Sequence, residues 1–196
     1  MKKLFELHQK ITLLVNEYHV LVDGPDGQQQ TAGFVKQKRF ALREQFSLYK
    51  DESQQEVVAS SKARSVLDFG AIYDVFDSKN QPIAALKKDF KRSLLISTWQ
   101  VYDAQMKTPL FTLHEKSQFM AIFRRLWELL PYLNDFPFPI KYHFVIKSDD
   151  TVVGEYIKIT RFRDHYALYM NDEAAPKLDI HAWMILAVLL DAMQSR

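Results

Sequence analysis

Eleven basic residues fall into three short groups, and grouped ammonium and guanidinium side chains are suited to binding phosphate and other anions. The groups are Lys36, Lys38, Arg39 and Arg43; Lys87, Lys88, Lys91 and Arg92; and Lys158, Arg161 and Arg163. Anionic lipid head groups are one such ligand, because each Lys or Arg near an anionic membrane adds favourable electrostatic energy. The structural alternative is that these residues keep strand ends soluble and prevent edge-to-edge pairing of strands.

Other site chemistries find little support. The chain has no Cys, which excludes disulfides, thiolate zinc sites and cysteine nucleophiles. Its six histidines form no His-Glu-x-x-His motif, and His181 is interpreted as a capping or core residue. The five glycines form neither a Gly-x-Ser-x-Gly elbow nor a phosphate-binding loop. We therefore predict no catalytic residues, no metal and no cofactor.

Composition is that of an ordinary globular protein. The 196 residues suit one domain covering 1–196, and 47% of them are hydrophobic. Lys and Arg number 26 against 24 Asp and Glu, so the formal net charge is +2. Nucleic-acid binding usually needs a larger positive excess, so we predict no nucleic-acid partner.

Membrane-spanning and export segments are not expected either. The longest apolar run covers residues 182–190, whereas a bilayer needs roughly 20 apolar residues. A helix that is apolar on every side is normally buried within protein, so we predict a core helix there, with Asp179 as its N-cap. Met1-Lys2-Lys3 is followed by a stretch that contains Glu6 and His8, which does not fit a signal peptide. We expect a cytoplasmic protein that is not transmembrane, with peripheral membrane contact as a further hypothesis.

The elements that must position the basic groups follow a repeat of about 26 residues. Aspartates after apolar or aromatic stretches recur at Asp23, Asp51, Asp77, Asp103, Asp149 and Asp172. Asp, Asn, Gly and Pro around them are typical of hairpin turns. Two strands per unit predict about twelve antiparallel strands, and closing the sheet removes its edges. A barrel of that size is too wide for its own side chains to fill, so the apolar helix is expected inside it.

One segment departs from the repeat. Residues 118–133 place apolar side chains at helical spacing, and Pro131 marks the expected end of that helix. An extended Phe136-Pro137-Phe138-Pro139 connector follows. We interpret residues 118–139 as a helical insertion, which either covers one end of the barrel or contacts a lipid or protein partner.

The repeat resembles that of a known family. Residues 34–49 contain an apolar strand, Lys36-Gln37-Lys38, an aromatic residue, a short loop and an aromatic strand, and an Asp turn follows at Asp51. This unit resembles the repeat of the LURF-one-related family. Fading copies occur at residues 86–90 and 157–162, and the ending with an apolar helix at 180–193 fits the same frame. The resemblance implies the fold of tubby C-terminal domains and phospholipid scramblases: about twelve strands closed around a hydrophobic helix, with no established enzymatic activity.

Two functions remain open at this stage. The first is a non-enzymatic cytosolic module that binds anionic lipid or phosphoinositide-like head groups at a basic barrel rim. Tubby domains bind phosphoinositide head groups through surface Lys and Arg, and this hypothesis extends that binding to the present chain by analogy of fold. The second is a protein-interaction or scaffold domain that acts through residues 118–139.

Overall fold

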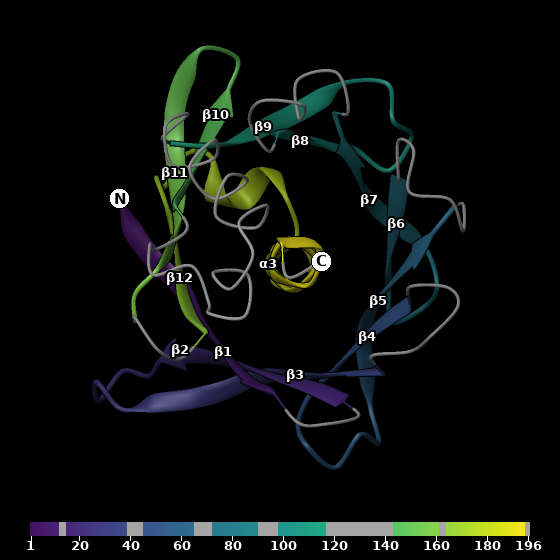
Figure 1. Ribbon diagram of the computed structural model, residues 1–196, viewed down its shortest axis with the longest axis vertical. Coiled ribbons are helices and arrows are strands. Elements are labelled where there is room, and N and C mark those ends of the chain that lie inside the picture. Colours follow the sequence, from purple (N-terminus) through teal and green to yellow (C-terminus); the bar gives the residue numbers. More distant parts are fainter. Residues whose placement is uncertain are drawn as a thin grey trace, which may run out of the picture.

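The protein is an antiparallel barrel closed around a central helix (Figure 1). The computed structural model describes residues 1–11, 15–38, 45–64, 72–89, 98–116, 143–160 and 164–194. In these ranges the strands are β1 (Lys2–Ile11), β2 (Val15–Asp23), β3 (Gln29–Lys38), β4 (Gln45–Tyr49), β5 (Val57–Ala63), β6 (Ile72–Asp77), β7 (Pro82–Lys88), β8 (Thr98–Tyr102), β9 (Pro109–Glu115), β10 (His143–Ser148), β11 (Thr151–Lys158) and β12 (His165–Met170). A short 3-10 turn, η1 (Ala175–Lys177), precedes the helix α3 (Ile180–Gln194).

Each strand pairs with its sequence neighbours, and β1 closes the ring by pairing with β12 as well as with β2. Alternation along β2 explains the two faces: Tyr18 and Val20 are fully buried inside, whereas Glu17 and His19 on the outside remain half-buried. Because side chains point to opposite faces of a strand in turn, this pattern places one side of the sheet in the core. The predicted twelve-stranded closed barrel is confirmed.

The helix α3 occupies the middle of the ring, where Figure 1 shows it end-on. All residues from 182 to 192 are buried, so the helix is surrounded on every side by the barrel wall. Asp179 Oδ1 accepts a hydrogen bond from the His181 backbone N–H at 2.8 Å, which confirms Asp179 as the N-cap. The predicted helix at 180–193 is confirmed and extends one residue further.

The helix also packs closely against β9–β12, where no space admits a water-sized sphere. Trp183, Leu186, Ala187 and Leu190 form the helix side of this contact, with residues of the four strands opposite. The barrel interior is therefore filled by the helix.

Aspartates shape the hairpin turns, as the sequence predicts. Asp77 Oδ1 accepts hydrogen bonds from the backbone N–H groups of Lys79 and Gln81, at 2.9 and 2.8 Å. Asp103 Oδ1 does the same for Gln105 and Lys107, at 3.1 and 3.0 Å. These bonds satisfy N–H groups that the tight turn would otherwise leave unpaired.

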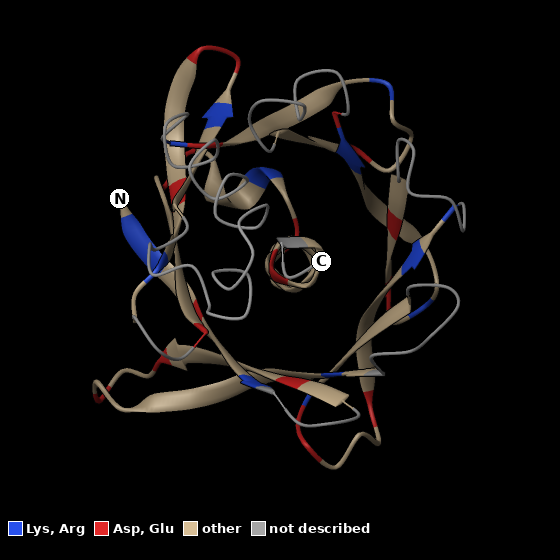
Figure 2. Ribbon diagram, viewed as in Figure 1, with Lys and Arg blue, Asp and Glu red and all other residues tan. Residues whose placement is uncertain are grey.

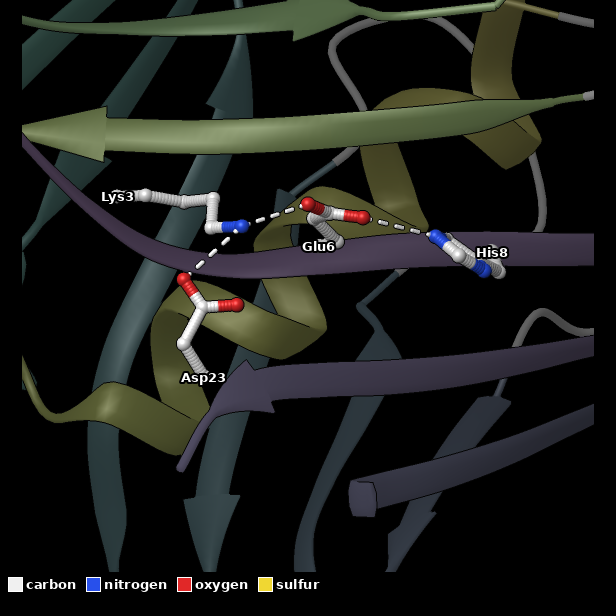
Figure 3. A network of polar contacts seen from close by, with 4 residues as sticks. All are labelled: Lys3, Glu6, His8 and Asp23. Atoms are coloured by element: carbon white, nitrogen blue, oxygen red, sulfur yellow. Dashed lines mark hydrogen bonds and ion pairs between the residues drawn. The ribbon is translucent and has the colours of Figure 1, made fainter. Parts of the chain in front are cut away.

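An ionic network fixes the N-terminal strand to β2 (Figure 3). Lys3 Nζ lies 2.7 Å from Glu6 Oε1 and 3.0 Å from Asp23 Oδ2, and His8 Nε2 lies 3.0 Å from Glu6 Oε2. Partial burial raises the pKa of Glu6, but hydrogen bonds from Lys3, Gln29 and His8 outweigh it and bring the pKa to about 2. Glu6 is therefore ionised in this network at neutral pH.

The predicted insertion at 118–139 lies outside the described residues.

Candidate basic rim at the loop end

The barrel has two distinct ends. At the hairpin end, tight turns connect β2 to β3, β4 to β5, β6 to β7, β8 to β9 and β10 to β11, and α3 begins there after β12. At the opposite end, which we call the loop end, the odd-numbered strands finish. Because β3, β7 and β11 all run toward it, Lys36 and Lys38, Lys87 and Lys88, and Lys158 stand at or near the loop end.

The other six predicted residues lie outside the described ranges: Arg39, Arg43, Lys91, Arg92, Arg161 and Arg163. In sequence they directly follow the same three strands.

The closed strand order separates the three groups around the ring. β3, β7 and β11 are each four strands apart, in both directions around the barrel. With strands about 4.8 Å apart, neighbouring groups are about 19 Å apart along the sheet. Figure 2 accordingly shows basic positions spread around the ring. The strand lysines therefore do not meet in one small-ligand site.

Charge is divided unevenly between the two ends. The five hairpin turns, residues 24–28, 50–56, 78–81, 103–108 and 149–150, contain seven acidic residues and three lysines. By composition, the segments outside the described ranges that join strands at the loop end contain nine Lys and Arg against four Asp and Glu. The hairpin turns are therefore acidic in composition, whereas the segments that join the strands beyond their loop ends are basic.

The described rim lysines differ in what they face. Lys36 is exposed on the outer face, in register with Glu17 of β2. Lys87 is half-buried and follows the outward alternation of β7. Lys88 shares the inner face with Ala84 and Leu86, and its Nζ lies 5.5 Å from the centroid of the Trp99 ring.

Lys158 is also on the inner face, because it alternates with Tyr156, whose hydroxyl donates to the Ala187 carbonyl of α3 at 3.2 Å. Its ammonium forms an ion pair with Asp164 and lies 6.0 Å from the Tyr166 ring centroid. The Lys158 charge is therefore already neutralised.

A buried polar cluster near the loop end was not found by sequence reasoning. Asp191 of α3 is 5% exposed, and its Oδ2 accepts a hydrogen bond from the Tyr18 hydroxyl at 3.1 Å. Gln9 Nε2 donates to the Tyr18 oxygen at 3.1 Å, and Asn16 Nδ2 donates to Gln37 Oε1 at 3.2 Å. The sequence signal was an acidic residue directly after the apolar run that forms the core helix.

Burial raises the pKa of Asp191 to about 6. Hydrogen bonds from Tyr166 and Tyr18 limit the increase, since they favour the charged carboxylate. Burial and the neighbouring carboxylate also raise the pKa values of both tyrosines well above the ordinary range. The cluster therefore holds one ionisable carboxyl and two neutral hydroxyl donors near neutral pH.

Histidines from distant parts of the sequence also meet. His165, His8 and His19 occupy consecutive register positions across β12, β1 and β2. The His8 and His165 rings stack with centroids 3.8 Å apart. No group of three His, Cys, Asp or Glu side chains arranged to hold a metal occurs within the described ranges.

The model of one protein family matches residues 31–191, most of the chain, and its description is LURP-one-related. The chain belongs to the LURP-one-related family. A search among curated proteins found no match. The resemblance inferred from the repeat is confirmed.

The LURP-one-related match includes all three basic groups, and its last residue is Asp191. It begins within β3, so it leaves out β1 and β2, which contribute Gln9, Asn16 and Tyr18 to the buried cluster. Within the described part of this LURP-one-related chain, no helix is long and apolar enough to cross a membrane.

Proposed function

We propose that this LURP-one-related protein is a non-enzymatic module that binds anionic lipid head groups with the loop end of its barrel, as a peripheral protein at a cytoplasmic membrane face. The observation that supports the proposal is the direction of β3, β7 and β11, which run to the same end and carry the described lysines of the three groups near it.

The spacing of the groups favours a membrane surface over a single small anion. Ligand groups about 19 Å apart cannot share one phosphate, but a bilayer offers many head groups in one plane. Each Lys or Arg near such a surface contributes about 1 kcal/mol. The acidic turns of the hairpin end would be repelled by the same surface, so the charge division orients the barrel with its loop end toward the lipid.

The non-enzymatic part of the proposal is supported by the filled interior. α3 occupies the space in which a barrel of this size would otherwise form a ligand cavity. Binding is therefore expected at the rim.

The test is co-sedimentation with phosphatidylcholine vesicles and with vesicles that also contain phosphatidylserine. Binding is expected only to the anionic vesicles and to weaken between about 0.1 M and about 1 M salt, where the Debye length falls from about 10 Å to about 3 Å. The triple charge reversal of Lys36, Lys38 and Lys88 to Glu should abolish binding.

A matched control reverses Lys50, Lys79 and Lys107 to Glu in the hairpin turns, with the same change in net charge. This control should retain binding, and equal loss in both triple variants would contradict the loop-end orientation. Absence of binding by the unaltered protein at low salt would overturn the lipid proposal. Partner capture with and without residues 118–139 would then test the protein-interaction alternative.

A further inference from the structure

The inner mouth of the barrel between β7 and β8 carries a cation beside an unused hydrogen-bond donor. Lys88, the last residue of β7, is in register with Trp99 of β8, and both side chains face inward. The Lys88 ammonium lies 5.5 Å from the Trp99 ring centroid. A cation over an indole face is attracted by the ring electrons, which holds the ammonium in place.

Trp99 has a buried hydrogen-bond donor that is not satisfied by the described residues. The residue is 1% exposed, and its Nε1–H has no hydrogen-bond partner within the part of the chain that the structure describes. Leaving a buried donor unpaired costs about 1–3 kcal/mol. A ligand atom that accepts a hydrogen bond from this N–H would recover that energy, which favours binding of an acceptor beside the indole.

The other rim lysines whose side chains the structure describes lack this combination. Lys158 is neutralised by Asp164, and Lys36 is exposed on the outer face opposite Glu17. Lys88 has no carboxylate within ion-pair distance among the described residues, and its recorded contact is the indole ring. Glu115 of β9 is also buried on the inner face, two residues beyond Leu113, which is in register with Trp99.

We propose that this mouth binds a phosphomonoester, with the Lys88 ammonium and the Trp99 Nε1–H as its two donors. The proposal rests on the proposed function and names the ligand class and position of one head-group site on the same rim. A phosphomonoester fits because it offers three strong acceptor oxygens and a charge near −2, so one oxygen can meet each donor. A phosphodiester has fewer free oxygens and a single charge.

The lipid arm compares vesicles of phosphatidylcholine mixed with phosphatidic acid, a monoester, against phosphatidylcholine mixed with phosphatidylserine, a diester. The unaltered protein should bind the phosphatidic acid vesicles more tightly. Lys88→Gln should reduce that binding about tenfold, as expected for a lost charge-assisted hydrogen bond. Trp99→Phe, which removes the N–H and keeps an aromatic ring, should reduce it about fivefold.

Lys87→Gln is the comparison variant, because it removes the same charge from the adjacent, outward-facing position. Lys87 belongs to the same rim, so its loss should weaken binding to both kinds of anionic vesicle alike and retain the preference for phosphatidic acid. Thermal unfolding of each variant separates lost binding from lost folding, and if Trp99→Phe does not fold, the comparison of Lys88→Gln with Lys87→Gln is the test. Equal effects of Lys87→Gln and Lys88→Gln on that preference, with salt-sensitive vesicle binding intact, would overturn this site while leaving the proposed function standing.

A second arm titrates glycerol 3-phosphate and inorganic phosphate and follows tryptophan fluorescence. A fluorescence change that is lost in Lys88→Gln but kept in Lys87→Gln supports the site for a soluble phosphomonoester, even if the unaltered protein binds no vesicles and the lipid proposal falls. Lack of any Lys88-dependent response in both arms would overturn the phosphomonoester site.

Discussion

The Tyr18 hydroxyl of β2 donates a hydrogen bond to the Asp191 carboxylate of α3 at 3.1 Å, across 173 positions of sequence. This bond joins the second strand to the far end of the central helix. It lies next to the β1–β12 pairing that closes the barrel. The groups that act on the Asp191 carboxyl are the hydroxyls of Tyr18, Tyr156 and Tyr166, the Lys158 ammonium and the Asp164 carboxylate.

Asp191 predicts a specific pH dependence of stability. Its pKa is about 6 in the folded protein against 3.8 as the ordinary value, so between these pH values the folded state binds the proton more tightly. Its contribution to the free energy of unfolding is fully present below pH 4 and is lost as the pH rises through about 6. Asp191→Asn cannot ionise, so the stability of this variant relative to the unaltered protein should rise by about 3 kcal/mol over that window.

The measurement is urea unfolding of both proteins from pH 4 to pH 7. Taking the difference at each pH removes the contributions of groups that the two proteins share. Tyr18→Phe is the companion variant: it removes one donor to the carboxylate, so the fall in stability should move to higher pH. A difference between Asp191→Asn and the unaltered protein that does not change with pH would contradict this account.

Glu6 predicts the opposite trend. Its pKa is lowered to about 2, so the stability that it contributes is present above its ordinary pKa of 4.5 and is lost as the pH falls toward 2. Glu6→Gln should lower the free energy of unfolding by about 1–2 kcal/mol at pH 7 and by much less at pH 3. Denaturant unfolding at the two pH values checks this, with Glu173→Gln as the control, because Glu173 is exposed in a turn and has no ion pair among the described residues.

Gly154 of β11 is predicted to be intolerant of a side chain. A Cβ at this position would lie 2.6 Å from the Tyr169 carbonyl oxygen and 2.2 Å from Met170 Sδ. Gly154→Ala should therefore destabilise the protein by about 1–3 kcal/mol, because the backbone of β12 must shift.

Gly33→Ala in β3 is the matched comparison. The closest atom to its Cβ would be the flexible tip of Leu48, at 2.8 Å, with the nearest backbone atom at 3.6 Å. Thermal unfolding should show a clearly smaller loss for Gly33→Ala. Equal losses of stability would mean that the close approach of β12 to residue 154 does not determine the cost of adding a side chain there.

Met106 occupies a backbone conformation that suits glycine. Three hairpin turns place a residue with positive φ three positions after an aspartate: Gln54 at 57°, Asn80 at 60° and Met106 at 55°. Met106→Gly should stabilise the protein by roughly 0.5–1 kcal/mol, since the left-handed region strains a side chain with a Cβ. Ala104→Gly in the same turn has no positive φ to relieve and should destabilise, so a common direction of the two melting-temperature shifts would contradict the argument.

Local patterns were sufficient for the elements of the fold. Asp77 and Asp103 predict hairpin turns because each side chain accepts hydrogen bonds from backbone N–H groups of its own turn. The apolar run at 182–190 predicts a buried helix, because a helix without a polar face is normally surrounded by protein. The repeat of these signals was enough to predict a closed barrel around the helix and the family.

The candidate site depends on distances between strands and on side-chain directions, which no local sequence pattern contains. The direction of β3, β7 and β11 follows from the repeat, but the distance between their lysines comes from the order in which twelve strands close. Whether a lysine faces inward follows from strand register. Register places the Lys88 ammonium over the Trp99 ring, whereas the adjacent Lys87 faces outward.

The sequence by itself determined which segments become strands, turns and the core helix, because those preferences act between residues a few positions apart. Tertiary structure alone decided that Tyr18 of β2 meets Asp191 of α3, and that the buried Trp99 N–H has no partner within the described ranges. The first contact forms only when the helix enters the closed ring, which joins segments that are 173 positions apart in the chain.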